Sequence, residues 1–135
     1  MIGDCRPVSG DTVHAAPGRY AEGESRAQGA THPPERVCIP GGVTLVSDKG
    51  AEETFIVGHL GTDAYTDGIG CGSNSVRCVS MGDKAILRGF TLTDGYTTYY
   101  DNPSGSPDSS RSGAGFFAMS ARTLYHAFGS SLSLR

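Results

Sequence analysis

Short runs of aliphatic, aromatic and β-branched residues alternate along the chain with stretches rich in glycine and polar residues. Runs of this length and composition are typical of β-strands bounded by turns. Sequences such as Pro-Gly, Gly-Gly and Gly-Asp-Lys separate neighbouring runs and predict tight turns. The pattern predicts strands over 11–16, 36–40, 43–47, 54–58, 76–81 and 85–93.

Three longer polar stretches, at 21–34, 59–75 and 96–112, predict exposed loops between these groups of strands. Helix signals are weak throughout. The segment 114–127 is long enough for a helix, but its Phe-Phe and Thr-Leu runs fit strands better. The sequence therefore predicts an all-β fold.

The strands after the first loop align with those after the second loop. The aligned pairs are Cys38 and Cys78, Leu45 and Leu87, and Phe55 and Phe90, at offsets of 40, 42 and 35 residues. A third, weaker set follows with Phe117, Leu124 and Phe128. Such offsets are expected when loops of unequal length separate similar repeats. We expect like side chains to stack, with Leu45 over Leu87 and Phe55 over Phe90.

The composition limits the size of the fold and its partners. With 135 residues the chain has room for one domain, and a hydrophobic share of 37% beside 20 glycines indicates many turns and a small core. The net charge is −3 and the 11 Lys and Arg residues are scattered, which argues against nucleic acid as a partner. No apolar run approaches the roughly 18 residues that a membrane span needs.

Several segments carry a resemblance to a known family. They are Gly10–Val13, Ala16–Tyr20, Val37–Leu45, Thr54–Gly58, Arg88–Gly95 and Gly113–Phe116. In this order they resemble the opening coils of right-handed parallel β-helix proteins of the pectate-lyase-like superfamily, and the later segments are similar to repeats of bacterial surface proteins. The resemblance covers about residues 10–126 of a single domain over 1–135, and leaves 127–135 as an irregular tail.

The resemblance implies a right-handed parallel β-helix of two to three coils with long loops on one edge, in an extracellular or cell-surface protein. The chain carries no secretory signal. It begins and ends without anything resembling a cap, and 128–135 no longer follow the repeat, so we expect a truncated fragment of a longer protein. Open coil ends expose unpaired strand edges, and we therefore expect self-association. The fold alone names no reaction, because the superfamily includes lyases, hydrolases, adhesins and structural proteins.

Exposed aromatic residues in the second and third loops are the candidate ligand-binding residues. They are Tyr65, Tyr96, Tyr99 and Tyr100, and Asp101 beside them is a further candidate. Tyrosine rings beside Asp and Asn side chains suit sugar rings, since the ring stacks on the apolar face while polar groups bind hydroxyls. The alternative is that these tyrosines cover the edges of the coils.

The four cysteines allow more than one arrangement. An even number in a small chain is compatible with an oxidising compartment. Cys71 and Cys78 bracket a short loop and could close it with a disulfide. Stacked coils would also bring Cys38 within reach of Cys78. Free thiols are the third alternative.

Catalytic chemistry has weaker support in the sequence. Asp63 and Asp67, with Lys84 or Arg88, are the nearest match to the acidic and basic groups that the resemblance implies for a polysaccharide lyase. The four histidines lie in separate segments, and no nucleophile motif occurs, so we predict no metal site and no cofactor. The leading prediction is a noncatalytic scaffold or surface binding module that contacts carbohydrate. The alternative is the N-terminal fragment of a polysaccharide lyase or glycoside hydrolase.

Overall fold

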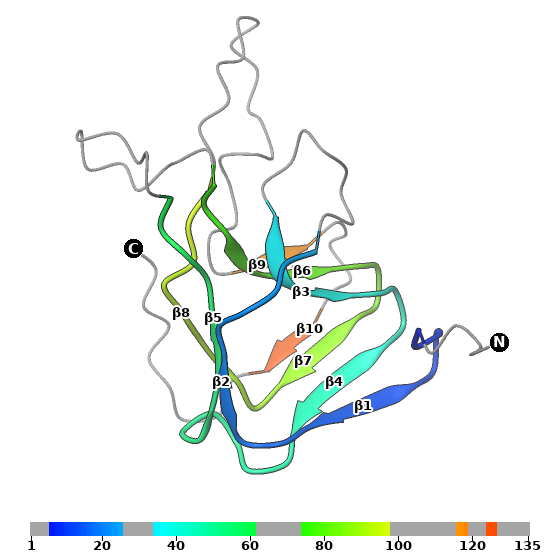
Figure 1. Cartoon of the computed structure of the whole chain (residues 1–135). Coiled ribbons are helices and arrows are strands. Elements are labelled where there is room, and N and C mark those ends of the chain that lie inside the picture. The colour runs from blue at the N-terminus through cyan, green and yellow to red at the C-terminus, as the bar shows by residue number, and fades with distance from the viewer. Residues whose placement is uncertain (1–5, 26–33, 62–73, 98–115, 119–123, 127–135) are drawn as a thin grey trace, which may run out of the picture.

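The computed structural model (Figure 1) describes residues 6–25, 34–61, 74–97, 116–118 and 124–126, the last two segments as backbone only. These residues form ten β-strands and no helix. The strands are β1 (Thr12–Ala15), β2 (Gly18–Tyr20), β3 (Glu35–Ile39), β4 (Thr44–Ser47), β5 (Thr54–Val57), β6 (Arg77–Met81), β7 (Ile86–Arg88), β8 (Thr91–Thr93), β9 (Phe116–Ala118) and β10 (Leu124–His126).

The prediction of an all-β fold is confirmed, and most predicted strands agree with the structure within two residues at their ends. Two details differ. The run 85–93 is divided into β7 and β8 at Gly89, which has φ +76. A left-handed backbone at this position breaks the extended conformation and favours glycine. The short strand β2 was not predicted as a separate element.

The strands form three parallel sheets, and the chain passes through the three sheets in turn. The sheet orders are β1-β4-β7-β10, β2-β5-β8 and β3-β6-β9. Each strand therefore pairs with the strand three elements later in the chain, and one strand from each sheet makes up one repeat. Figure 1 shows the successive repeats lying side by side along each sheet. No helix long and apolar enough to cross a membrane occurs in the part of the chain described above.

Where both partners are described, the observed register confirms one predicted pair and corrects the others. Leu45 lies opposite Leu87, as predicted. Cys38 lies opposite Ser80 and not Cys78, so that prediction was wrong by two residues. Leu87 lies opposite Tyr125 and not Leu124, while the partner predicted for Phe90, Phe128, lies outside the described residues.

The prediction that Phe55 stacks over Phe90 was wrong by one residue. Phe55 pairs with Thr91, and the guanidinium carbon of Arg19 lies 5.5 Å from the centre of the Phe55 ring. Because alternate residues of a strand face opposite sides, Phe55 and its buried neighbour Ile56 face opposite sides of β5. Phe90 precedes β8 and is buried at 2% exposure. One phenylalanine thus supports a surface arginine, and the other fills the core.

All three sheets contribute to one hydrophobic core. Its buried members are Ile39, Val43, Ile56, Cys78, Val79, Met81, Ala85, Leu87, Phe90 and Leu92. Burying a large apolar side chain contributes about 1.5–3 kcal/mol. Because its members come from every sheet, this core joins the three sheets to one another.

The turns between β3 and β4 and between β6 and β7 also stack on one another. Gly42 N donates to Asp83 O (2.9 Å), and Gly82 N donates to Ile39 O (2.8 Å). A Cβ on Gly82 would lie 2.5 Å from Gly41 N, so only glycine allows this approach. The predicted Gly-rich turns are therefore part of the stacked structure.

Candidate functional site

Three long connections leave the β2-β5-β8 sheet and return to the β3-β6-β9 sheet. They span 21–34, 58–76 and 94–115, between consecutive strands of these two sheets. Because β2, β5 and β8 are parallel neighbours, their carboxyl ends lie side by side, and the three connections begin next to one another.

Two antiparallel bridges hold the first and second connections at their bases. Ser25 N donates to Glu35 O (2.7 Å), and Glu35 N donates to Ser25 O (3.0 Å). His59 N donates to Val76 O (3.1 Å), and Val76 N donates to His59 O (2.9 Å). Each connection is thereby closed by a pair of backbone hydrogen bonds.

Arg36 joins the first connection to the end of β5, where the second connection begins. Its Nε donates to Val57 O (2.7 Å), and its Nη1 donates to Gly23 O. Hydrogen bonds from a charged donor are stronger than neutral ones. The guanidinium therefore holds the start of one connection against the start of the next.

The second and third connections also meet through their backbones. Gly58 N donates to Thr93 O (2.9 Å), and Tyr96 N donates to Val76 O (3.2 Å). We refer to these contacting residues together as the loop base. The loop base consists of Gly23, Ser25, Glu35, Arg36, Val57, Gly58, His59, Val76, Thr93 and Tyr96.

Of the predicted sugar-contacting residues, the structure describes only Tyr96. It is half-buried and belongs to the loop base, where its backbone joins the third connection to the second. The others, Tyr65, Tyr99, Tyr100 and Asp101, lie outside the described residues. Their role in binding remains a prediction.

The described cysteines are free thiols, and Cys78 is buried. Cys38 is half-buried opposite Ser80, so stacking does not place it beside Cys78. Cys78 Sγ donates to Thr93 O (3.2 Å). Cys71 lies outside the described residues, and a bridge between Cys71 and Cys78 stays a prediction. Burial raises the pKa of the Cys78 thiol from 9.0 to about 11, which makes it a poor nucleophile at neutral pH.

The raised pKa of Cys78 predicts a loss of stability in alkali. The unfolded thiol ionises above pH 9.0, whereas the folded thiol keeps its proton until about pH 11. The free energy of unfolding should therefore fall over this interval, by at most about 2–3 kcal/mol. Urea unfolding of wild type and Cys78→Ala at pH 8, 9, 10 and 11 measures the effect. A decline of equal size in both proteins would contradict it.

A pair of buried opposite charges lies where the first two connections rejoin the sheet. Glu35 on β3 and Arg77 on β6 are register partners, and both are 0% exposed. They face the same side as the next pair in the ladder, Val37 and Val79. The sequence analysis did not predict this pair. Glu35 stands two residues before Val37, Arg77 stands two residues before Val79, and the two valines are register partners.

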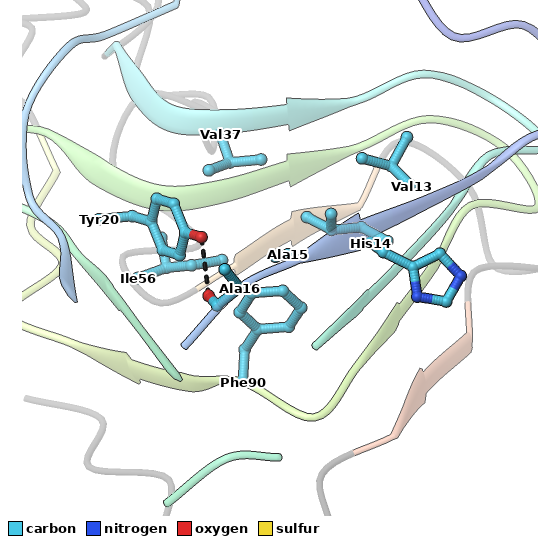
Figure 2. Close-up of a pocket in the computed structure, with 9 residues that line it drawn as sticks. Val13, His14, Ala15, Ala16, Tyr20, Val37, Ile56 and Phe90 are labelled. Atoms are coloured by element: carbon cyan, nitrogen blue, oxygen red, sulfur yellow. Dashed lines mark hydrogen bonds between the residues drawn. The ribbon is translucent and has the colours of Figure 1, made fainter. Parts of the chain in front are cut away.

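An apolar hollow of about 270 Å³ lies among β1, β2 and β3. Val13, Tyr20 and Val37 line its walls, while the nearly fully buried Ile56 and Phe90 lie deeper (Figure 2). The Tyr20 hydroxyl donates to Ala16 O (2.8 Å), which fixes the ring beside the hollow. The lining offers apolar contacts and few polar groups.

The remaining candidate catalytic groups that the structure describes lie in separate elements. His14 Nδ1 lies 2.8 Å from Asp48 Oδ1 in an exposed pair, and Figure 2 shows its ring pointing away from the hollow. Lys84 is exposed in a turn, with φ 60, and Arg88 is exposed at the end of β7. Asp63 and Asp67 lie outside the described residues, among which no group of three metal-ligating side chains occurs.

Comparisons with family models, with curated proteins and with solved structures gave no match to this chain.

Proposed function

We propose that the chain is a right-handed parallel β-helix that acts as a noncatalytic scaffold and presents its three long connections as one binding surface. The cyclic order of the sheets supports this fold, because each repeat adds one strand to each of three parallel sheets. Connections between parallel strands of one sheet are right-handed in about 98% of cases. The handedness is proposed on that rule and on the resemblance of the sequence to such proteins.

The observation that carries the proposed function is the loop base. Backbone bridges, the Arg36 hydrogen bonds and the contact between Gly58 and Thr93 hold the starts of all three connections together. Rigid support lowers the entropic cost of binding through loops. A scaffold that fixes the bases of three adjacent connections is suited to presenting them to one ligand.

We further propose a polysaccharide ligand and an extracellular or cell-surface location. The second and third connections contain Tyr65, Tyr99 and Tyr100, and Tyr96 stands at the base of the third. Tyrosine combines an apolar ring with a polar hydroxyl, which suits the two kinds of surface on a sugar. The adjacent starts of these connections support a shared site.

Binding to a glycan array tests the carbohydrate proposal. Wild type should bind at least one class of polysaccharide, and the double variant Tyr99→Ala, Tyr100→Ala should lose at least about tenfold in affinity. This loss corresponds to about 1.4 kcal/mol, the contribution expected from two stacked aromatic rings. Thermal unfolding of both proteins should be alike, because the sequence predicts that both tyrosines lie in an exposed loop.

Val8 provides a control, since it is 65% exposed in the turn before β1 and far in sequence from the tyrosines. Val8→Ala should bind as wild type does. The carbohydrate proposal is wrong if wild type binds nothing on the array, or if the tyrosine variant binds normally.

A further inference from the structure

The apolar hollow lies at one end of the three sheets. β1, β2 and β3 each stand last in their sheets, with a neighbouring strand on one side only among the described residues. Val13 and Tyr20, which line the hollow, are 37% and 39% exposed. Exposed apolar side chains beside unpaired strand edges favour association with another chain.

In the part of the chain that the structure describes, the opposite end of the same sheets is formed by β10, β8 and β9. All pairings within the three sheets are parallel. A second copy, shifted along the stack, would therefore present one edge strand in the required direction to β1, to β2 and to β3. On β3 the docking strand would lie beside Val37–Ile39, beyond the bridge between Ser25 and Glu35. A single extended peptide would cover only one of the three strands.

We propose that copies of this chain associate head to tail, with β10, β8 and β9 of one copy pairing with β1, β2 and β3 of the next and covering the apolar hollow. The proposal rests on the proposed β-helix and extends its strand ladders across two molecules. The contact joins two different surfaces, so each dimer still has one free surface of each kind. Further copies can therefore bind at both ends.

Head-to-head association is disfavoured by the shape of the hollow. A twofold axis would set two hollows of about 270 Å³ against each other. An unfilled apolar space of that kind loses the close contacts that stabilise protein interiors. It would also join strands of the two copies in antiparallel pairs, unlike every pair within the three sheets.

Two columns of the β1-β4-β7-β10 sheet allow a direct test by disulfide formation. One column contains residues 14, 46, 88 and 126, and the other contains residues 12, 44, 86 and 124. In a head-to-tail pair, residue 126 of one copy would neighbour residue 14 of the next. The spacing of paired strands, about 4.8 Å, lies within the Cα range that a disulfide accepts.

His14→Cys and His126→Cys proteins should be mixed under mild oxidation, and linked peptides identified by mass spectrometry so that native thiols are distinguished. The expected product is a disulfide between positions 14 and 126. Thr12→Cys and Leu124→Cys proteins, mixed in the same way, test the second column and should form a disulfide between positions 12 and 124. Sedimentation velocity of wild type should show a mass that rises with concentration, to at least twice 14.0 kDa.

Three outcomes would overturn the proposal. They are a wild-type monomer at all concentrations, efficient 14–14 or 126–126 dimers, and association without a cross-link in either column. The variant Val46→Cys, Arg88→Cys is the internal control, because these residues are register partners within one chain. If its internal disulfide forms while copies fail to link, only head-to-tail association is wrong. If the internal disulfide also fails, the proposed β-helix is wrong.

Discussion

Replacing Arg77 with methionine is expected to lower the free energy of unfolding by about 3–5 kcal/mol. Arg77 and Glu35 are register partners and both are 0% exposed. Both residues make further interactions, so removing the guanidinium leaves the groups that it contacts, and the buried Glu35 on the adjacent strand, with less compensation for their burial. A buried charge that loses its compensation is far more costly than the loss of an exposed ion pair.

Urea unfolding of the wild type, Arg77→Met, Glu35→Gln and the double variant measures this effect. The double variant should be less destabilised than the sum of the single variants, with a coupling of about 0.5–3 kcal/mol. Arg88→Met is the control, because Arg88 is exposed on β7, and it should change stability by no more than about 0.5 kcal/mol. A change below 1 kcal/mol in Arg77→Met would contradict the prediction.

The position of this charge pair relates stability to the candidate site. Glu35 begins β3 and Arg77 begins β6, where the first and second connections return to the sheet. A shift of register by one residue between β3 and β6 would place the two charges on opposite faces of the sheet. The pair therefore favours the register that aligns the bases of the connections.

Local pattern was sufficient to predict the strands and the long connections, but not the register in every sheet. The turns between β3 and β4 and between β6 and β7 both contain four residues, 40–43 and 82–85. One offset of 42 residues must therefore hold on both sides of these turns. The predicted pair Leu45 and Leu87 has this offset, whereas the predicted pair Cys38 and Cys78, which matches cysteine with cysteine, has an offset of 40. The offset of 42 would have placed Glu35 opposite Arg77.

Phe55 was misplaced for a different reason. The turn between β4 and β5 contains 48–53, whereas the turn between β7 and β8 contains only 89–90. Phe55 and Phe90 could be register partners only if each held the same position in its strand, but Phe55 is the second residue of β5 and Phe90 precedes β8. The shorter turn instead brings Phe90 into the core before β8 begins.

The loop base could not be predicted from residue types, because its contacts are made largely by the backbone. Carbonyl oxygens such as those of Val57 and Gly23, which accept from Arg36, have no signature in the sequence. The hollow arises from the place of β1, β2 and β3 at the ends of their sheets. Both features depend on how the repeats stack, which the pattern within one strand does not specify.

Replacing Gly58 with alanine is expected to destabilise the protein by about 3 kcal/mol or more, and to loosen the loop base. A Cβ at this position would lie 2.5 Å from both Asp94 O and Gly95 Cα, and closer still to Val76 O. All three are backbone atoms, so no side chain can rotate away to make room. Overpacking typically costs 1–3 kcal/mol, and it costs most where the surroundings cannot relax.

Gly50→Ala separates this steric effect from the ordinary cost of replacing glycine. Gly50 has φ +87 and open space around it, so its substitution should cost about 1 kcal/mol through backbone strain. Chemical unfolding compares the two variants, and limited proteolysis reports on the second and third connections. Gly58→Ala should be cut faster within 58–76 and 94–115, while Gly50→Ala should be cut at the wild-type rate. Equal stability of the two variants would mean that the backbone at Gly58 can move apart, and the loop base would then not be rigid.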